Sequence, residues 1–304
     1  MKNILITGGL GHIGSYLIRN LSFEYNIKVI DNLLTQRYCS LFNLNRKISF
    51  KEKDIRSINI DDLENIDIVI HLAAITDAGN SFKNQKEIEE INIIDTKIFI
   101  DTCKKSNVKL FIFPSTTSVY GVLTKMAYED NSKYLKPQSV YAESKLDIEN
   151  YIEKELGDNV KYLILRLGTI FGISEGMRFH TAINKFCYQS SLNIPLTIWK
   201  ENYNQIRSYL GLNDLNKCLE YLFSLEKYWN QVYNVVSYNK KLVDIIDIIK
   251  NNIKNVELNM VDTPLLNQYS YEVSTKKIKN TGFLFEDDIE YHIKLTLDKL
   301  SKLN

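Results

Sequence analysis

Cysteine, histidine and proline are scarce in this sequence of 304 residues, which contains four of each. The cysteines Cys39, Cys103, Cys187 and Cys218 are spread over most of the chain, and their spacing matches no zinc or redox motif. The histidines are equally dispersed. The sequence therefore predicts no metal site, and its unclustered cysteines are typical of reduced thiols in a cytoplasmic protein.

A strong charge of one sign and long apolar runs are also absent. The formal net charge is +1, whereas proteins that bind nucleic acid usually carry a marked basic excess. No apolar run approaches the length of about 20 residues that a membrane-spanning helix needs. The first apolar segment already begins at Asn3, so we expect no secretory signal before the fold. The composition indicates a globular protein that binds neither nucleic acid nor a membrane.

Three glycines follow the first apolar segment with the spacing of a dinucleotide-binding loop. Residues 3–7 predict a buried strand and residues 13–21 predict a helix, with Gly8, Gly11 and Gly14 between them. In such a loop the first glycine permits a tight turn, and the second lets the backbone approach a pyrophosphate. The third lets the helix pack against the strand. Amides at the helix N-terminus then face the phosphates.

A carboxylate ends the second predicted strand, residues 28–31. Asp31 can accept hydrogen bonds from both hydroxyls of an adenosine ribose and would repel a 2′-phosphate, which favours NAD over NADP. The alternative is that Asp31 is an acid at the solvated end of a strand. Arg37 lies a few residues further on and could weaken the preference for NAD, but it is interpreted as a surface residue. The small residues Ala73 and Ala74 follow the fourth predicted strand. They allow either direct contact of a cofactor with the backbone or close packing of a helix.

The stretch 108–145 contains the residues expected to perform the chemistry. It begins with an apolar run that predicts a buried strand, which Pro114 is expected to end because proline has no amide hydrogen. Thr116 lies just beyond, at the strand's carboxyl end, where open α/β sheets bind their ligands. Tyr141 and Lys145 are four residues apart in a predicted helix and so share one face. A free tyrosine has a pKa near 10. The ammonium group of Lys145 favours the ionised phenolate, which can then act as a base, and Thr116 would hold the substrate hydroxyl. The alternative for this pair alone is an amphipathic helix with a surface lysine.

These motifs occur in one order along the chain: the glycine loop, Asp31, the run His71-Leu72-Ala73-Ala74, Thr116, Tyr141 and Lys145. In this combination the sequence resembles the extended short-chain dehydrogenase/reductase family, in particular its nucleotide-sugar epimerases and dehydratases. The resemblance covers nearly the whole chain. It implies an α/β fold with a doubly wound parallel sheet of the Rossmann type, NAD as cofactor and a nucleotide-diphosphate sugar as substrate.

The resemblance also implies which residues form the site. Thr116, Tyr141 and Lys145 would be catalytic. The cofactor would contact the glycine loop, the ends of three further strands and the catalytic pair, that is Gly8, Gly11, His12, Ile13, Gly14, Asp31, Asn32, Asp54, Ile55, Leu72, Ala73, Ala74, Tyr141 and Lys145. Asn92 matches a family position that braces the active-site strand, and the alternative is a buried helix asparagine.

The residues expected at the substrate depart in part from the family pattern. Thr116 and Thr117 would contact the sugar, and Thr169 stands where relatives usually have a sugar-contacting asparagine. A Gln-x-Arg motif ending at Arg207 matches the family's diphosphate contact, a task that suits a guanidinium because it grips phosphate oxygens in pairs. A surface salt bridge is the alternative. No arginine follows Arg207, so Arg178 or a lysine would replace the second diphosphate-binding arginine.

We predict two parts in the chain. Residues 1–168 would form the NAD-binding Rossmann domain. Residues 169–304 would form a smaller, mixed C-terminal lobe that binds the nucleotide sugar, with some segments returning to the first domain. Within this second part, Asp214 is expected to cap a helix that runs to Leu225.

The implied reaction is NAD-dependent hydride transfer at C4 of the sugar through a 4-keto species. A 4-epimerase is favoured, and a net C4 dehydrogenase that releases the 4-keto sugar is the alternative. The family's 4,6-dehydratases carry Asp-Glu after the catalytic threonine, and its sugar-acid decarboxylases carry a glutamate at the second of these positions. Here the residues are Thr117 and Ser118, which cannot act as that acid. A non-catalytic NAD-sensing protein on the same fold is a second alternative, against which the retained Tyr141 and Lys145 argue.

The resemblance finally implies a homodimer. In the family, the helices corresponding to residues 87–105 and 141–155 pair with their twofold mates in a four-helix bundle. Apolar residues left partly exposed on these helices would favour a partner. Those expected to be exposed are Ile94, Ile98, Ile148 and Ile152.

Overall fold

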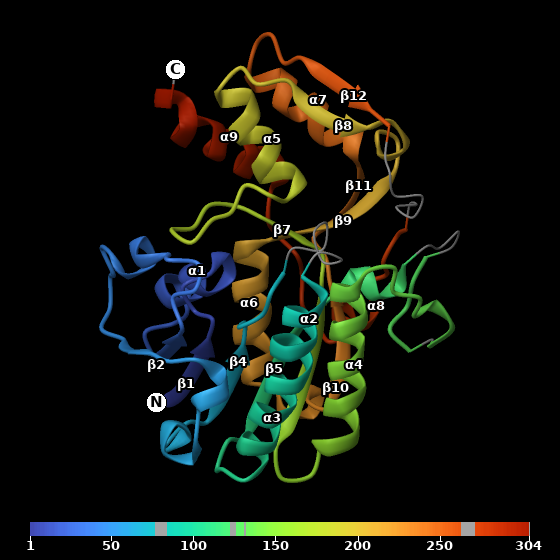
Figure 1. Cartoon of the computed structure of the whole chain (residues 1–304). Helices are drawn as coiled ribbons and strands as arrows, with labels where there is room; N and C mark the ends of the chain where they lie inside the picture. The colour runs from blue at the N-terminus through green and yellow to red at the C-terminus, as the bar shows by residue number, and fades with distance from the viewer. Residues whose placement is uncertain (77–83, 122–125, 131, 263–270, 304) are drawn as a thin grey trace.

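A computed structural model describes residues 1–76, 84–121, 126–130, 132–262 and 271–303 of the chain. A larger unit built on a parallel sheet carries a smaller lobe at one end of that sheet (Figure 1). The N-terminus lies in the larger unit, and the last helix lies in the lobe (Figure 1).

The large sheet is seven-stranded and parallel throughout, in the order β10-β6-β5-β4-β1-β2-β3. Its strands are β1 (Lys2–Thr7), β2 (Tyr25–Asp31), β3 (Ser49–Glu52), β4 (Ile68–His71), β5 (Leu110–Thr116), β6 (Lys161–Leu167) and β10 (Gln231–Val235). The inner strands are continuous apolar runs because helices cover both faces of the sheet. The predicted doubly wound fold is confirmed, with strand order reversing between β1 and β4.

Helices cover the two faces in separate apolar layers. On one face α1 (His12–Asn20) and α6 (Leu212–Phe223) contribute to a core that includes Leu17 and Leu219. On the other, α3 (Thr96–Lys104) and α4 (Val140–Glu155) contribute Phe99 and Ile148. The short helices are α2 (Gln85–Ile88) and α8 (Lys276–Lys279). The buried apolar residues of α1 and α4 therefore face the sheet.

The smaller lobe has its own core and two small sheets. One sheet holds β7 (Thr169–Phe171), β9 (Ile206–Gly211) and β11 (Tyr238–Lys241), and the other pairs β8 (Leu196–Trp199) with β12 (Leu258–Val261). The helices α5 (Ala182–Ser191), α7 (Leu242–Asn252) and α9 (Ile289–Leu300) pack around them. β10 and α6 follow residue 168 in the sequence but pack in the large unit. The predicted division at residue 168 therefore divides the sequence, and its correspondence to two domains stays a prediction.

Pro114 does not end its strand, as the sequence predicted it would. β5 runs on to Thr116 and pairs with β6 over its whole length, including Pro114 opposite Leu165. Its pairing with β4 stops earlier, at Ile112. The missing amide hydrogen of Pro114 therefore costs no ladder bond, because β4 no longer pairs with β5 at this residue.

The exposure predicted for four isoleucines is half right. Ile94 and Ile98 are 50% and 52% exposed, whereas Ile148 and Ile152 are fully buried. The last two lie on the side of α4 that packs against the sheet. A π-helical segment, Glu89–Asp95, adds a residue to the turn before α3. It buries polar residues in place of Ile94.

The described residues hold no cluster of three or more histidine, cysteine or acidic side chains that could bind a metal ion. Among the same residues, no helix combines the length and the apolar character needed to cross a membrane. The four cysteines are free thiols, and only Cys39 is exposed.

Asp214 joins the last part of the chain to the large unit rather than capping a helix. It lies inside α6, and its Oδ1 accepts hydrogen bonds from the amides of Glu286 (2.7 Å) and Asp287 (3.1 Å). Its Oδ2 accepts one from the hydroxyl of Ser237 (2.5 Å). In return, Asp287 accepts a bond from the Asp214 amide (2.9 Å). Both acids are buried, so each depends on these donors.

We expect Asp214→Asn to lower the free energy of unfolding by about 2–3 kcal/mol. One of the two acceptor oxygens becomes an NH2 group, so part of the set of buried donors around it loses its acceptor. Urea unfolding followed by circular dichroism measures this as a lower midpoint with an unchanged slope. Asp298→Asn, the same change at an exposed position of α9, is the control. A loss below about 0.5 kcal/mol for Asp214→Asn would contradict the proposed role of this contact.

Candidate functional site

One cavity of about 350 Å³ lies at the carboxyl ends of the parallel strands. Every residue that the sequence assigned to catalysis or to the cofactor lines it, as do Thr117, Thr169 and Arg178. Arg207 is not among its lining residues. Residues that the sequence did not indicate also line it, among them Leu34, Thr35, Ile75, Thr76, Ile91, Leu167, Ile170, His180 and Thr181. Several of these come from loops that carry no recognisable motif, so only the folded chain reveals them.

The glycine loop lies directly against the end of β4. Gly8 has a φ of +64°, and a Cβ built on it would lie 2.6 Å from backbone atoms of Ala73. The Gly8 amide donates to the carbonyl of Ile30 (2.8 Å). Only a residue without a side chain fits here, and the contact leaves the N-terminus of α1 facing the cavity. A loop of this shape fits a dinucleotide pyrophosphate.

Asp31 both shapes the loop and faces the cavity. Its carboxylate accepts hydrogen bonds from the amides of Leu10 (3.0 Å) and Leu33 (2.9 Å). Each oxygen keeps a free lone pair, which suits the hydroxyl donors of a ribose. Further along, Asn32 donates to Asp54 (2.9 Å) at the same end of the cavity.

Arg37 is not the surface residue that the sequence suggested. It is partly buried, lines the cavity, and donates from Nη1 to the carbonyl of Gly176 (3.0 Å). It also interacts electrostatically with Asp31. The end of the cavity that holds Asp31 therefore contains a cation as well as an acid.

The segment 172–178 crosses the glycine loop and carries Arg178 into the cavity. His12 Nε2 bonds to the carbonyl of Gly172 (2.8 Å), and the Ser174 hydroxyl donates to the carbonyl of His12 (2.8 Å). The Gly176 amide donates to the hydroxyl of Ser15 (2.9 Å). Burial lowers the pKa of His12 to about 4, so this imidazole is neutral and adds no charge beside the glycine loop.

Lys145 is fixed between α4 and β5. Its ammonium donates to the carbonyl of Pro114 (2.9 Å) and lies 4.4 Å from the ring centroid of Phe113 and 5.9 Å from that of Tyr141. Burial lowers the pKa of Lys145 to about 8, while the carboxylate of Glu149 acts in the opposite direction. The Pro114 carbonyl is available to Lys145 because no strand pairs with that side of β5.

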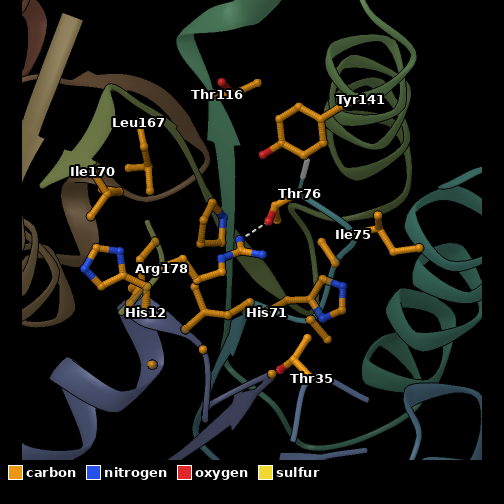
Figure 2. A pocket seen from close by; sticks show the side chains of 18 of the residues that line it. His12, Thr35, His71, Ile75, Thr76, Thr116, Tyr141, Leu167, Ile170 and Arg178 are labelled. Atoms are coloured by element: carbon orange, nitrogen blue, oxygen red, sulfur yellow. Dashed lines mark hydrogen bonds between the residues drawn. The ribbon is translucent and has the colours of Figure 1, made fainter. Parts of the chain in front are cut away.

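Tyr141 shares the cavity with Thr116, which stands at the end of β5 (Figure 2). Burial raises the pKa of Tyr141 to about 12, and the Arg178 guanidinium is the cation that acts against this rise. The sequence assigned that effect to Lys145. Figure 2 shows Arg178 inside the cavity with its guanidinium directed at Thr76, to whose hydroxyl it donates a hydrogen bond.

Two of the predicted substrate residues lie beside each other outside this catalytic set. The hydroxyl of Thr117 is 3.3 Å from that of Tyr271, and the guanidinium of Arg207 lies 5.7 Å from the Tyr271 ring centroid. Arg207 Nη2 donates to Gln205 (2.8 Å). Arg178 thus lines the cavity near Tyr141, whereas Arg207 does not line it.

Two buried polar residues brace the strand ends. Asn92 bonds to both the amide (2.8 Å) and the carbonyl (2.9 Å) of Ile75, so it holds the segment after β4 and not β5 itself. His71 lies between the hydroxyls of Thr7 (2.8 Å) and Thr96 (3.2 Å), and burial lowers its pKa to about 3. His71 was noted in the sequence only as part of a motif run. Its place at the end of an apolar strand was the signal for this buried bracing role.

Known proteins share both the sequence pattern and the fold. A model described as the NAD dependent epimerase/dehydratase family matches residues 4–235. A trifunctional UDP-glucose 4,6-dehydratase/UDP-4-keto-6-deoxy-D-glucose 3,5-epimerase/UDP-4-keto-L-rhamnose-reductase from Arabidopsis thaliana is 31% identical over 98% of the chain, which spans 47% of that relative. A putative UDP-glucose 4-epimerase from Methanocaldococcus jannaschii is 27% identical, with 99% of both chains covered. The structure of a UDP-glucuronic acid 4-epimerase from Bacillus cereus superposes with a TM-score of 0.88 at 24% identity, covering 99% of this chain and 100% of the other.

Proposed function

The chain belongs to the NAD dependent epimerase/dehydratase family, and from its site we propose that it is a nucleotide-sugar 4-epimerase. The observation that carries this proposal is one cavity in which the glycine loop and Asp31 lie at one end and Thr116, Tyr141 and Lys145 at the other. A cofactor held by the first group would present its reactive end to the second. NAD bound there would supply a reversible hydride acceptor for C4 of the sugar.

The residues of the chain then handle the proton and the orientation of the sugar. Tyr141 takes the proton of the C4 hydroxyl, Thr116 holds that hydroxyl in place, and Arg178 stabilises the phenolate that Tyr141 must form. Lys145 holds the nicotinamide ribose. Thr117, Thr169 and Arg207 are proposed to bind the sugar and its diphosphate.

A dehydratase is the other activity that the names of the relatives suggest, and the site argues against it. Elimination of water from a 4-keto sugar needs an acid beside C5 and C6. Of the cavity-lining residues that the structure describes, only Asp31 and Asp54 are acidic, and both lie at the ribose and adenine end. The residues after Thr116 are Thr117 and Ser118, neither of which carries a carboxyl group.

The proposal is tested with UDP-glucose, UDP-galactose, UDP-glucuronic acid and dTDP-glucose as substrates. For an epimerase we expect the C4 epimer by NMR, with no absorbance at 340 nm in proportion to product. A net dehydrogenase would form NADH with each 4-keto sugar released, and a dehydratase would form a 4-keto-6-deoxy sugar. An NAD-binding protein that converts none of a wider panel would favour the non-catalytic alternative. A cytoplasmic location remains part of the proposal.

Asp31→Ala is expected to weaken NAD binding about tenfold or more and to narrow the preference over NADP. A charge-assisted hydrogen bond contributes about 1.5–3 kcal/mol, and the repulsion of a 2′-phosphate disappears with the carboxylate. Calorimetric titration with both nucleotides measures this. Arg37→Met is the matched variant, since it should weaken NADP more than NAD. Equal affinities of the wild-type protein for the two nucleotides would refute the assignment of Asp31 to the ribose.

Tyr141→Phe is expected to lower turnover by about 10²-fold or more, because it removes the group that accepts the proton and keeps the ring. NAD binding and the melting temperature should stay near those of the wild type. Lys145→Met should reduce turnover and NAD affinity together. Near wild-type turnover of a confirmed substrate by the phenylalanine variant would make Tyr141 structural.

We also propose a homodimer formed through the exposed face around Ile94 and Ile98. Ile98→Asp should shift the mass in solution toward a monomer, because a carboxylate would be buried in the interface. Ile60→Asp is a matched control, since Ile60 is equally exposed, at 52%, in another part of the molecule. Light scattering at micromolar concentration provides the masses. A wild-type protein that is already monomeric would disprove the proposal.

A further inference from the structure

A buried charge network lies directly beneath the catalytic residues. The carboxylate of Glu149 accepts hydrogen bonds from Nε (3.1 Å) and Nη2 (2.6 Å) of Arg166, and the two side chains are only 2% and 4% exposed. Glu149 also accepts a bond from the hydroxyl of Ser115. The network extends through Arg166 Nη1 to the hydroxyl of Tyr120 (2.9 Å), which donates to Asn234 (2.7 Å). It therefore ties α4 to three neighbouring strands, β5, β6 and β10.

Stability alone does not explain charges in this place. Removing a carboxylate and a guanidinium from water is costly, and apolar residues of similar size often replace a buried ion pair without loss. The position of Glu149 suggests another reason. It follows Lys145 by four residues on α4 and so lies on the same buried face, while Ser115 directly precedes Thr116. Glu149 is thus one helical turn from Lys145, and it is hydrogen-bonded to Ser115, the residue before Thr116.

The ammonium of Lys145 has few groups that favour its charge. On α4, Tyr141 is neutral at rest and Glu149 is the acid. On β5, the Pro114 carbonyl and the Phe113 ring face it, and on β4, His71 is neutral. Arg166 on β6 lies beyond Glu149, which it grips. Burial works against the cation, and Glu149 is the group that opposes burial.

We propose that Glu149 is a positioning residue of the site, whose buried carboxylate keeps Lys145 cationic and holds the end of β5 that carries Thr116. This inference rests on the proposed function for its meaning in catalysis. The state of Lys145 is nevertheless a property of the free protein. It can be measured without any substrate.

The direct test is NMR titration of protein labelled with [ε-13C]lysine, in which the Lys145 signal is assigned by its absence from Lys145→Met. We expect Glu149→Gln to lower the pKa of Lys145 by about one pH unit or more, since the nearby opposite charge is lost. Glu149→Asp, which keeps the charge, should restore most of that value. Glu153→Gln is the matched control, because Glu153 is an exposed glutamate one turn further along α4. An unchanged pKa of Lys145 in Glu149→Gln would overturn the proposal.

A second variant covers the case that Glu149→Gln does not fold with an unpaired guanidinium inside. The double variant Glu149→Gln with Arg166→Met removes both charges of this ion pair, and a smaller fall in the pKa of Lys145 is expected, because a cation is lost together with the acid. With a confirmed substrate, the alkaline limb of the pH dependence of kcat should move down in step. A purely structural role would lower stability and leave that limb in place. If the wild-type protein converts no nucleotide sugar, the proposed function fails, while the NMR titration still decides the role of Glu149.

Discussion

The contact between the glycine loop and the end of β4 is the constraint on which the site depends. Strand order reverses between β1 and β4, so the loops after these strands diverge and leave a crevice. Gly8 packs against Ala73 so tightly that no side chain fits between them. The carboxyl ends of β2, β4 and β5 then bring Asp31, Ala73 and Thr116 to its rim. Residues more than 80 positions apart in sequence share one cavity as a consequence of that single register.

The sequence predicted those parts of the structure that follow from local pattern. The strand and helix periods, the glycine spacing and the Tyr141/Lys145 pair were sufficient for the parallel sheet and for the catalytic end of the cavity. What they could not predict depends on which neighbour a residue meets. Pro114 continues its strand because β4 has already stopped pairing beside it. Ile148 and Ile152 are buried because the α4 face that carries Lys145 packs on the sheet. Arg178 reaches Tyr141 because segment 172–178 crosses the glycine loop.

Burial decides the charges of the site as much as the residue types do. It keeps His12 and His71 neutral, lowers the pKa of Lys145 and raises that of Tyr141. The two cations beside Tyr141, Lys145 and Arg178, therefore depend on the groups around them. The crossing segment carries Arg178 into the cavity, where its guanidinium donates a hydrogen bond to the hydroxyl of Thr76. Lys145 is held by the Pro114 carbonyl and by the field of Glu149.

These charges bear on which of the two hydride-transfer reactions the site suits. Tyr141 starts as a neutral phenol with a raised pKa and must pass through a phenolate to take the proton of the sugar hydroxyl. In an epimerase the phenolate takes this proton as the hydride leaves C4 and gives it back as the hydride returns, so each turnover ends on the same phenolate. In a net dehydrogenase, the buried tyrosine must instead lose that proton to solvent before the next turnover. Because burial makes this phenolate costly to form, the site suits a reaction that regenerates the phenolate without releasing a proton to solvent, which is why we favour the epimerase.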